Sequence, residues 1–267
     1  MILKHMRERV DGLAVEDTFE ALDERSGTTL ANCMIYTQTC PELFPARPVR
    51  IYIDISDQPA PDALLGAAVA RAKDIAAQSG SPARIFAQVE PDDADRMSSL
   101  ATLGFKDNDG LVRMRRDLPA PDSGKLPYGC VLVRDLLDDP IEQKYFLERR
   151  NQLYSEARGF DWLQEFRAKQ GFGRILIVSQ TGMVGEVIHW KENGTGILGW
   201  LHVAKKWRRK GISQRLIELA CADLYASDLY RVEAEIQARV PNLLHTMEKA
   251  GFRQAELICR YPGIDIN

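Results

Sequence analysis

Residues 201–216 read LHVAKKWRRKGISQRL. An apolar run ends at Val203, five of the six residues from Lys205 to Lys210 are basic, and Gly211 opens an apolar pattern with helical spacing. A strand, a short glycine loop and a helix together leave unpaired N–H groups at the helix start, where the dipole adds about half a positive charge. The stretch therefore predicts an anion site or, alternatively, a solvated basic turn.

The residue types in this loop favour phosphate as the anion. Gly211 lets a phosphate approach the backbone, and the small Ser213 adds a hydroxyl donor. Arg208, Arg209 and Lys210 supply cations for phosphate oxygens. Neither GxxxxGK[ST] nor GxGxxG is present, so the loop is not a P-loop or a dinucleotide fingerprint.

Composition excludes several other classes of protein. The chain has 267 residues, 45% hydrophobic and 27% charged, as in globular proteins. The 35 basic and 38 acidic residues give a net charge of -3, which argues against a general nucleic-acid binder. We find no apolar run long enough to span a membrane and no signal peptide in residues 1–12, and we expect a cytoplasmic protein. The five cysteines form no metal-ligand pattern, so we expect buried or idle thiols and no metal.

The two halves of the chain repeat each other. Residues 83–105 align without gaps on residues 230–252, at an offset of 147, and each copy is typical of a strand, a helix ended by glycine and a further strand. The identical pairs are Arg84 and Arg231, Ala87 and Ala234, Gly104 and Gly251, Phe105 and Phe252, and Arg113 and Arg260. A proline-rich stretch places a linker at 119–127, between domains at 1–118 and 128–267.

Hydrophobic periodicity predicts the elements of both halves. In the first half, strands are expected at 19–24, 28–36, 50–56, 83–89 and 111–118, and helices at 62–78 and 93–103. In the second half, helices are expected at 140–157, 161–171, 211–228 and 242–251, and strands at 174–180, 183–194, 197–203, 230–238 and 256–262.

The stretch 201–216 resembles the signature of GCN5-related N-acetyltransferases (GNATs), a strand ending in Val, then Arg/Gln-x-x-Gly-x-Gly/Ala, then a helix. Arg208, Gly211 and Ser213 fill its three positions, with Ser in place of the usual last Gly or Ala. The segment EKAGF at 248–252 resembles the family's closing helix and strand, and the turn before Val184 resembles its second hairpin. The resemblance covers nearly all of 128–264.

The resemblance implies an α/β (mixed α+β) fold of two tandem GNAT-like domains, each a mixed, mostly antiparallel sheet flanked by helices. It also implies an acetyl-CoA site between a strand that splays from its neighbour and the following helix, with the pyrophosphate at the helix start. The implied cofactor-binding residues are Leu201, His202, Val203, Arg208, Arg209, Lys210, Gly211, Ile212, Ser213 and Gln214.

The first copy departs from the signature. At the same offset, Ser56, Pro61, Leu64 and Gly66 stand for Val203, Arg208, Gly211 and Ser213, and its loop DQPAPDA (57–63) carries two acids, two prolines and no base. Prolines remove amide donors, and aspartates repel phosphate. The first half therefore resembles the degenerate copy of tandem acetyltransferases with one working half.

Acyl transfer to an amine needs a group that accepts a proton. Glu235, sixteen residues before Gly251, matches the position of the base in relatives that acetylate protein N-termini; the alternative is an ordinary solvent-facing strand carboxylate. The first half has Gln88 there. The family's usual acid, a Tyr four residues before that Gly, is Met247 here; a thiol with an ordinary pKa of about 8.5 can leave as thiolate without it.

Further candidates have alternative explanations. His202 can serve as a base or lend only its backbone, and Glu186 and His189 can line the acceptor cleft or pack within the sheet. His245 is expected to be structural, and Asn242 lies two residues from the family's CoA-contacting Asn. Aromatic residues of the helical region can shape the acceptor pocket or pack in the core: Phe160, Trp162 and Phe166.

These observations predict an N-acetyltransferase that moves an acetyl group from acetyl-CoA to an amine of a small molecule, a protein N-terminus or a lysine, with the active site in the second half. The alternatives are a non-catalytic CoA-binding or regulatory protein and, third, a nucleic-acid module. We expect an amine acceptor as partner, no nucleic acid or membrane, and a monomer or homodimer.

Overall fold

The computed structural model describes residues 1–6, 10, 12–55, 61–119 and 124–267. These residues form two compact units, each built from separate stretches of chain. Unit 1 comprises Met1–Gly110, Gln152–Glu156 and Ile258–Asn267, and unit 2 comprises Leu111–Asn151 and Ala157–Leu257. Four residues of the expected linker, 120–123, and residues 57–60 of the loop DQPAPDA lie outside the described residues.

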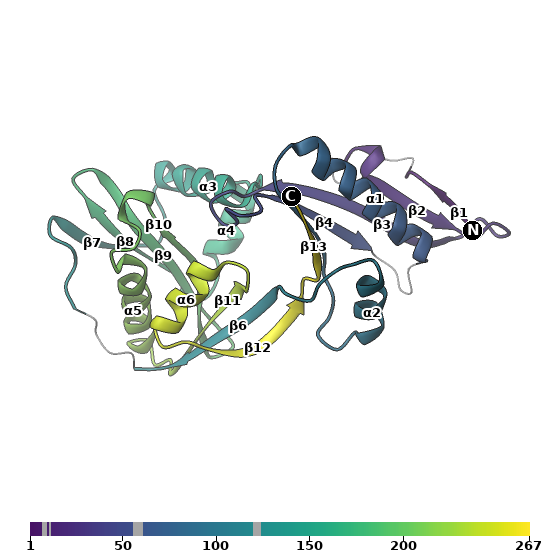
Figure 1. Ribbon diagram of the computed structural model, residues 1–267. Coiled ribbons are helices and arrows are strands. Elements are labelled where there is room, and N and C mark those ends of the chain that lie inside the picture. Colours follow the sequence, from purple (N-terminus) through teal and green to yellow (C-terminus); the bar gives the residue numbers. More distant parts are fainter. Residues whose placement is uncertain (7–9, 11, 56–60, 120–123) are drawn as a thin grey trace. The chain divides into compact units, whose positions relative to one another are not determined.

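Unit 1 is a six-stranded sheet in the order β1-β2-β3-β4-β5-β13, in which only β4 and β5 run parallel. Helix α1 packs on β2 to β5 through residues spaced three and four apart, such as Leu65, Ala68 and Ala72 (Figure 1). The elements are β1 (Ile2–Lys4), η1 (Val15–Asp17), β2 (Thr18–Leu22), β3 (Thr29–Thr39), β4 (Val49–Ile55), α1 (Asp62–Ser79), β5 (Ala83–Ala87), α2 (Ala94–Thr102) and β13 (Gly263–Ile266).

Unit 2 is a seven-stranded sheet in the order β12-β6-β11-β10-β9-β8-β7, with β10 and β11 parallel. Its elements are β6 (Gly110–Asp117), β7 (Cys130–Asp135), α3 (Pro140–Tyr154), α4 (Phe160–Arg167), β8 (Gly173–Ser179), β9 (Gly182–Glu192), β10 (Thr195–Val203), η2 (Lys205–Trp207), α5 (Ile212–Tyr225), β11 (Arg231–Gln237), α6 (Pro241–Lys249) and β12 (Arg253–Arg260). The mixed α/β fold with two sheets flanked by helices is as predicted.

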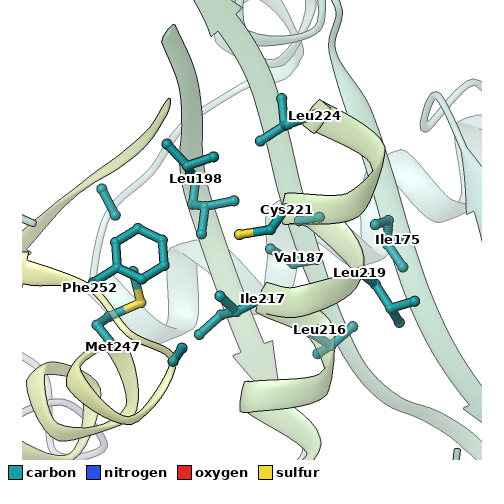
Figure 2. Packing of buried hydrophobic residues seen from close by; sticks show 14 of the residues in the cluster. Ile175, Val187, Leu198, Leu216, Ile217, Leu219, Cys221, Leu224, Met247 and Phe252 are labelled. Carbon is teal, nitrogen blue, oxygen red and sulfur yellow. The ribbon is translucent and has the colours of Figure 1, made fainter. Parts of the chain in front are cut away.

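The core of unit 2 lies between α5 and the sheet. Ile217, Cys221 and Leu224 of α5 meet Val187 of β9 and Leu198 of β10, and Figure 2 shows these side chains together. The spacing of four and three along α5 places its apolar residues on one face, which confirms the helix expected from the sequence.

The cysteines are largely buried. All five are free thiols; four are buried and Cys130 is half-buried, which confirms the expected buried or idle thiols. Burial disfavours the charged thiolate and raises the pKa of Cys33 and of Cys221 to about 12.

The two sheets exchange strands. Segment 111–118 is a strand, as predicted, but it does not complete the sheet of the first half: as β6 it lies between β11 and β12, and Glu235 faces Arg113 in the antiparallel register. In return β13, which was not predicted, pairs with β5 in the sheet of unit 1. The alternating apolar residues of β6 specify a strand with one buried face, and either sheet satisfies that pattern.

The internal repeat is visible in the elements. Helix α2 spans 94–102 and α6 spans 241–249, which is the offset of 147 found in the sequence. The order of parallel strand, helix, parallel strand and helix recurs as β4-α1-β5-α2 and as β10-α5-β11-α6. The two halves therefore share one order of strands and helices, so matching positions in them can be compared directly.

Candidate active site

The strands β10 and β11 separate at their carboxyl ends. They pair at two positions only, Gly196 with Val232 and Ile197 with Glu233, although β10 continues to Val203. The other edge of β10 stays paired with β9 as far as Val203. The predicted splay is confirmed, and it leaves an opening between β10 and β11. In unit 1 the matching strands β4 and β5 pair at five positions, from Val49 to Ile53 on β4.

Helix α5 begins beside this opening. Its N-cap is Gly211, in the left-handed conformation with φ 76° that favours glycine, and among the described residues no side chain caps the helix. The N–H of Arg215 donates to the Gly211 carbonyl, so the N–H groups of the first turn precede the helical ladder. These unpaired donors and the helix dipole fit a phosphate group.

The basic residues of the loop have different roles. Arg208 Nε donates to the carbonyl of Val203 at 3.0 Å, which ties the loop to the end of β10. Lys206 Nζ donates to Thr181 Oγ1 at 2.8 Å, and Lys210 Nζ lies 4.8 Å from the centre of the Trp207 ring. Arg209 is exposed. The charge of Arg209 and Lys210 thus remains on the surface near the start of α5.

The remaining predicted cofactor residues lie on either side of this loop. Leu201 and Val203 pack against the core under α5, and alternation along the strand turns His202 to the other face. At the start of α5, Ile212 is buried and Ser213 is half-buried. Gln214 Nε2 donates to Glu218 Oε1 at 3.0 Å, one turn further along the helix.

Glu235 lies on the part of β11 that β10 leaves unpaired. Its side chain is 52% exposed, and Oε1 accepts a hydrogen bond from Arg113 Nη2 at 3.1 Å. Arg113 also contacts Glu256 of β12, and the hydrogen bond that Arg113 donates to Glu235 raises the pKa of the guanidinium. Glu235 is therefore an accessible carboxylate beside the opening, held by a cation.

The sequence candidates Met247 and His189 are both buried. Met247 is 2% exposed and packs in the core beside Phe252, as Figure 2 shows. His189 is buried near Asp223 of α5; desolvation lowers the pKa of its imidazole and outweighs the opposing effect of the Asp223 carboxylate.

On α6, His245 is exposed, with Nδ1 3.9 Å from Glu248, which does not fit the structural role expected for it. The carbonyl of Asn242 accepts a hydrogen bond from the Thr246 hydroxyl. The side chains of α6 therefore supply no proton donor at the usual position of the family acid, because that position is Met247.

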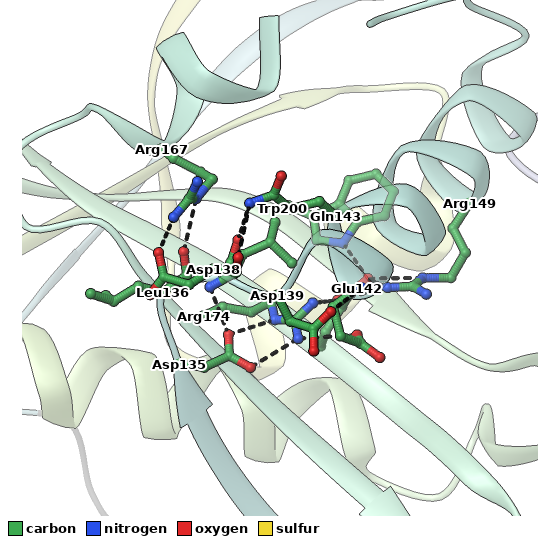
Figure 3. A network of polar contacts seen from close by, with 12 residues as sticks. Asp135, Leu136, Asp138, Asp139, Glu142, Gln143, Arg149, Arg167, Arg174 and Trp200 are labelled. Atoms are coloured by element: carbon green, nitrogen blue, oxygen red, sulfur yellow. Dashed lines mark hydrogen bonds and ion pairs between the residues drawn. The ribbon is translucent and has the colours of Figure 1, made fainter. Parts of the chain in front are cut away.

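A buried carboxylate occupies the face of the sheet opposite α5. Glu186 of β9 is 0% exposed and accepts hydrogen bonds from Arg149 of α3, at 3.0 Å from Nη2 to Oε1, and from Trp200 Nε1 at 3.1 Å. Arg174 Nη1 lies 3.7 Å from Glu186 Oε2. Figure 3 shows Arg149, Trp200 and Arg174 gathered from a helix and two strands. A fully buried charge requires such partners.

Arg174 extends this network. Its Nε and Nη2 donate to the two oxygens of Asp135, both at 2.9 Å, and Nη2 donates to Glu142 at 3.2 Å. Burial lowers the pKa of this guanidinium, but the hydrogen bonds with Asp135 and the neighbouring carboxylates outweigh it, and the pKa is raised. Arg149, Arg174 and Trp200 were not among the residues predicted from the sequence. The signal that pointed to them is a glutamate in the apolar strand pattern VGEVIHW, because a buried carboxylate demands a buried cation.

Aromatic side chains surround the network. Phe166 lies 5.0 Å from Trp162, 5.8 Å from Phe172 and 5.4 Å from Trp190, between ring centres, so it packs in an aromatic cluster. Phe160 is half exposed. The Trp200 ring stacks on His202 with centres 5.9 Å apart and planes at 9°, which connects the buried network to the end of β10.

Comparison with known proteins agrees with this geometry. Residues 135–252 match the model of the Acetyltransferase (GNAT) family. A GCN5-related N-acetyltransferase from Sphaerobacter thermophilus is 14% identical, with 96% of this chain and 82% of that chain covered and a TM-score of 0.51. Comparison with curated proteins gives no match.

Two further solved structures are similar. A conserved protein of unknown function from Enterococcus faecalis V583, described as a probable N-acyltransferase, is 12% identical, with 92% and 61% covered and a TM-score of 0.54. A tandem GNAT protein from the clavulanic acid biosynthesis pathway is 15% identical, with 97% and 89% covered and a TM-score of 0.47. At these identities the likeness concerns the fold, and a GNAT fold supports an acyl-CoA N-acetyltransferase function in general.

Among the described residues, no helix combines the length and apolar character that crossing a membrane requires. In the same part of the chain, no three His, Cys, Asp or Glu side chains gather where they could hold a metal ion.

Proposed function

We propose that unit 2 binds acetyl-CoA and transfers its acetyl group to an amine. The observation that carries this proposal is the separation of β10 from β11 beyond Ile197 and Glu233, beside the uncapped start of α5. Such an opening exposes backbone groups that can hydrogen-bond an extended chain such as pantetheine, and the helix start suits its pyrophosphate. Both features come from elements within the matched GNAT domain.

The residues proposed to hold acetyl-CoA divide into two groups. The backbone of the strand end lines the opening, and the loop and the first helical turn surround the pyrophosphate. In this proposal the strand end comprises Leu201, His202 and Val203, and the loop and turn comprise Arg208, Arg209, Lys210, Gly211, Ile212, Ser213 and Gln214.

Unit 1 is proposed to be a degenerate copy without a cofactor site. Its strands β4 and β5 remain paired where β10 and β11 separate, and Pro61 precedes α1 where Arg208 stands in the second copy. The first turn of α1 also carries Asp62, whose charge disfavours phosphate at that helix start.

Isothermal titration with acetyl-CoA tests the binding site. We expect Gly211→Glu to abolish measurable binding, because it places a negative charge and a side chain at the helix start. Gly194→Glu is the matched control: Gly194 also has φ 76°, and a Cβ at either glycine meets no atom within 4 Å. Equal affinities of the two variants, or no binding by the unmodified protein, would contradict the proposal.

Glu235 is proposed to accept a proton from the incoming ammonium group before it attacks. Assays with a panel of primary amines, in which release of the CoA thiol is measured, test both catalysis and this role. We expect Glu235→Gln to lower kcat by about 10²-fold and to leave acetyl-CoA affinity nearly unchanged. Glu256→Gln is the matched control, because Glu256 is also 52% exposed and also contacts Arg113.

The panel also separates an enzyme from a non-catalytic CoA-binding protein. Acetyl-CoA binding without thiol release for any amine would favour the non-catalytic alternative. An equal kcat for the two glutamine variants would remove Glu235 from the mechanism while leaving the cofactor site intact.

A further inference from the structure

The reaction of the proposed function needs a second proton transfer. An amine that has lost its first proton still carries an N–H that must leave as the amide forms, and the departing sulfur needs a proton to become a thiol. At the usual position of the family acid stands Met247, a thioether buried in the core, which can neither accept nor donate this proton. Another group must therefore transfer this proton from the nitrogen to the sulfur, or the sulfur must leave as an unprotonated thiolate.

His202 is placed for this step. It is half-buried at the end of β10, within the stretch that β11 leaves unpaired. Its register partner on β9 is Glu186, and its ring lies on the face of the strand opposite Leu201 and Val203. Its side chain therefore lies next to the backbone that the proposed function assigns to the pantetheine.

A chain of contacts fixes the orientation of the His202 ring. The ring stacks on Trp200 at 9°, and Trp200 Nε1 donates to Glu186 Oε1 at 3.1 Å. Glu186 is held in turn by Arg149 Nε and Nη2 at 3.0 to 3.2 Å. The indole cannot rotate without leaving a fully buried carboxylate short of a donor, which is costly. The imidazole therefore packs against an indole ring whose orientation is fixed by its hydrogen bond to Glu186.

We propose that His202 carries the second proton, with Trp200 and Glu186 as positioning residues; this inference rests on the proposed function. As the C–N bond forms and the C–S bond breaks, the neutral imidazole takes the proton from the nitrogen and passes it to the leaving thiolate. His202 ends neutral, so the step consumes no other reactant. Histidine is suited to both transfers near neutral pH.

Several charged groups act on His202. Glu186 on β9 faces it directly in the register, Arg149 and Arg174 approach Glu186 from α3 and β8, and Glu235 lies on β11 across the opening. Two carboxylates favour the imidazolium and two guanidiniums oppose it. Loss of one charge from this set is therefore expected to change the proton affinity of His202.

NMR of the resting protein tests the proton-carrying state without any turnover. The chain has four histidines, so the imidazole Cε1 signals are few, and His202→Gln assigns the one of interest. We expect this signal to titrate between about pH 5 and pH 8 and to move when Trp200→Phe removes the indole donor to Glu186. A His202 signal that does not titrate in that range would overturn the proposal.

Kinetics with two nucleophiles test the step itself. Hydroxylamine is largely unprotonated near neutral pH, so it needs the second proton transfer but not the first. We expect His202→Gln to lower kcat by about 10²-fold or more with hydroxylamine and with a primary amine, at nearly unchanged acetyl-CoA affinity. Glu235→Gln is expected to slow only the primary amine. The control is His245→Gln on the exposed face of α6.

Besides the NMR outcome, two results from kinetics and binding would overturn the inference. Equal kcat for His202→Gln and His245→Gln, with acetyl-CoA binding intact, would remove His202 while preserving the proposed function. Failure of the unmodified protein to bind acetyl-CoA would overturn the proposed function and this inference with it. A lower kcat in Trp200→Phe, at unchanged affinity for acetyl-CoA and with a shifted His202 signal, would support the positioning role.

Discussion

Arg84 of β5 donates from Nη1 to Asp265 of β13 at 2.9 Å, although the two residues are 181 positions apart in the chain. The Arg84 side chain is 0% exposed, and its Nη2 also donates to Asn108 Oδ1 and to the carbonyl of Tyr261. This buried guanidinium fastens the C-terminal strand to the sheet of the first half. A cation without exposure needs all of these acceptors.

Neutralising Asp265, which like Asp109 places a carboxylate beside Arg84, should weaken unit 1. We expect Asp265→Asn to lower the free energy of unfolding by about 2 kcal/mol, because it leaves a buried cation with less compensation. Urea denaturation measures the change. Asp117→Asn is the control: Asp117 lies 3.7 Å from Arg231, the repeat counterpart of Arg84, on an exposed surface, and it should cost under about 0.5 kcal/mol. Equal losses would contradict the assignment.

Division of the chain should show that the halves depend on each other. A fragment of residues 124–267 lacks β6, so β11 and β12 lose the strand that lies between them. We expect this fragment to be insoluble or unfolded alone and to fold when co-expressed with residues 1–119. Circular dichroism and size-exclusion chromatography measure this outcome. Cooperative unfolding of the isolated fragment would show that the exchanged strand is dispensable.

Gly199 should tolerate no side chain. A Cβ at this position would lie 1.7 Å from Cζ3 of Trp190, at the irregularity of β10 between Leu198 and Trp200. We expect Gly199→Ala to lower the free energy of unfolding by about 1–3 kcal/mol through overpacking. Gly159→Ala is the control, because Gly159 has negative φ and open space around it. Thermal denaturation of the two variants should separate them clearly, and equal midpoints would refute the steric argument.

Stability should fall in mild acid because of His189. Desolvation lowers the pKa of this imidazole in the folded protein, so the unfolded chain binds more protons over the window between the two values. The free energy of unfolding therefore decreases as the pH falls through the ordinary value of about 6.5, and the loss stops below the folded value. Urea titrations across this range should show a smaller slope for His189→Gln. An unchanged slope would mean that other groups control the pH dependence.

Sequence patterns predicted the elements near the site well, because apolar spacing and helix starts depend on residues that are close together in the chain. The apolar spacing of α5 and the glycine before it predicted the helix and its start. The sequence offset of 147 predicted α6 as the counterpart of α2 in the repeat. The short strands β1 and β13 and the six-residue β7 were not predicted, since so few residues carry little periodicity.

The candidate site was predictable only in part. Arg208, Gly211 and Ser213 identified the loop because a helix start with glycine is a local arrangement. The contacts of Glu186 with Arg149 and Trp200 were not predictable, because these residues are brought together from α3, β9 and β10 by packing of the helix on the sheet.

Neighbouring residues along the chain specified the GNAT-like order of elements, the glycine loop at 208–214 and the presence of Met247 at the position of the family's usual acid, because each of these features is local. Tertiary structure alone decided which sheet receives β6 and β13, and that Trp200 and Glu186 hold the ring of His202. A strand with alternating apolar residues can pair with the edge of either sheet, so the complete tertiary structure determines which sheet it joins.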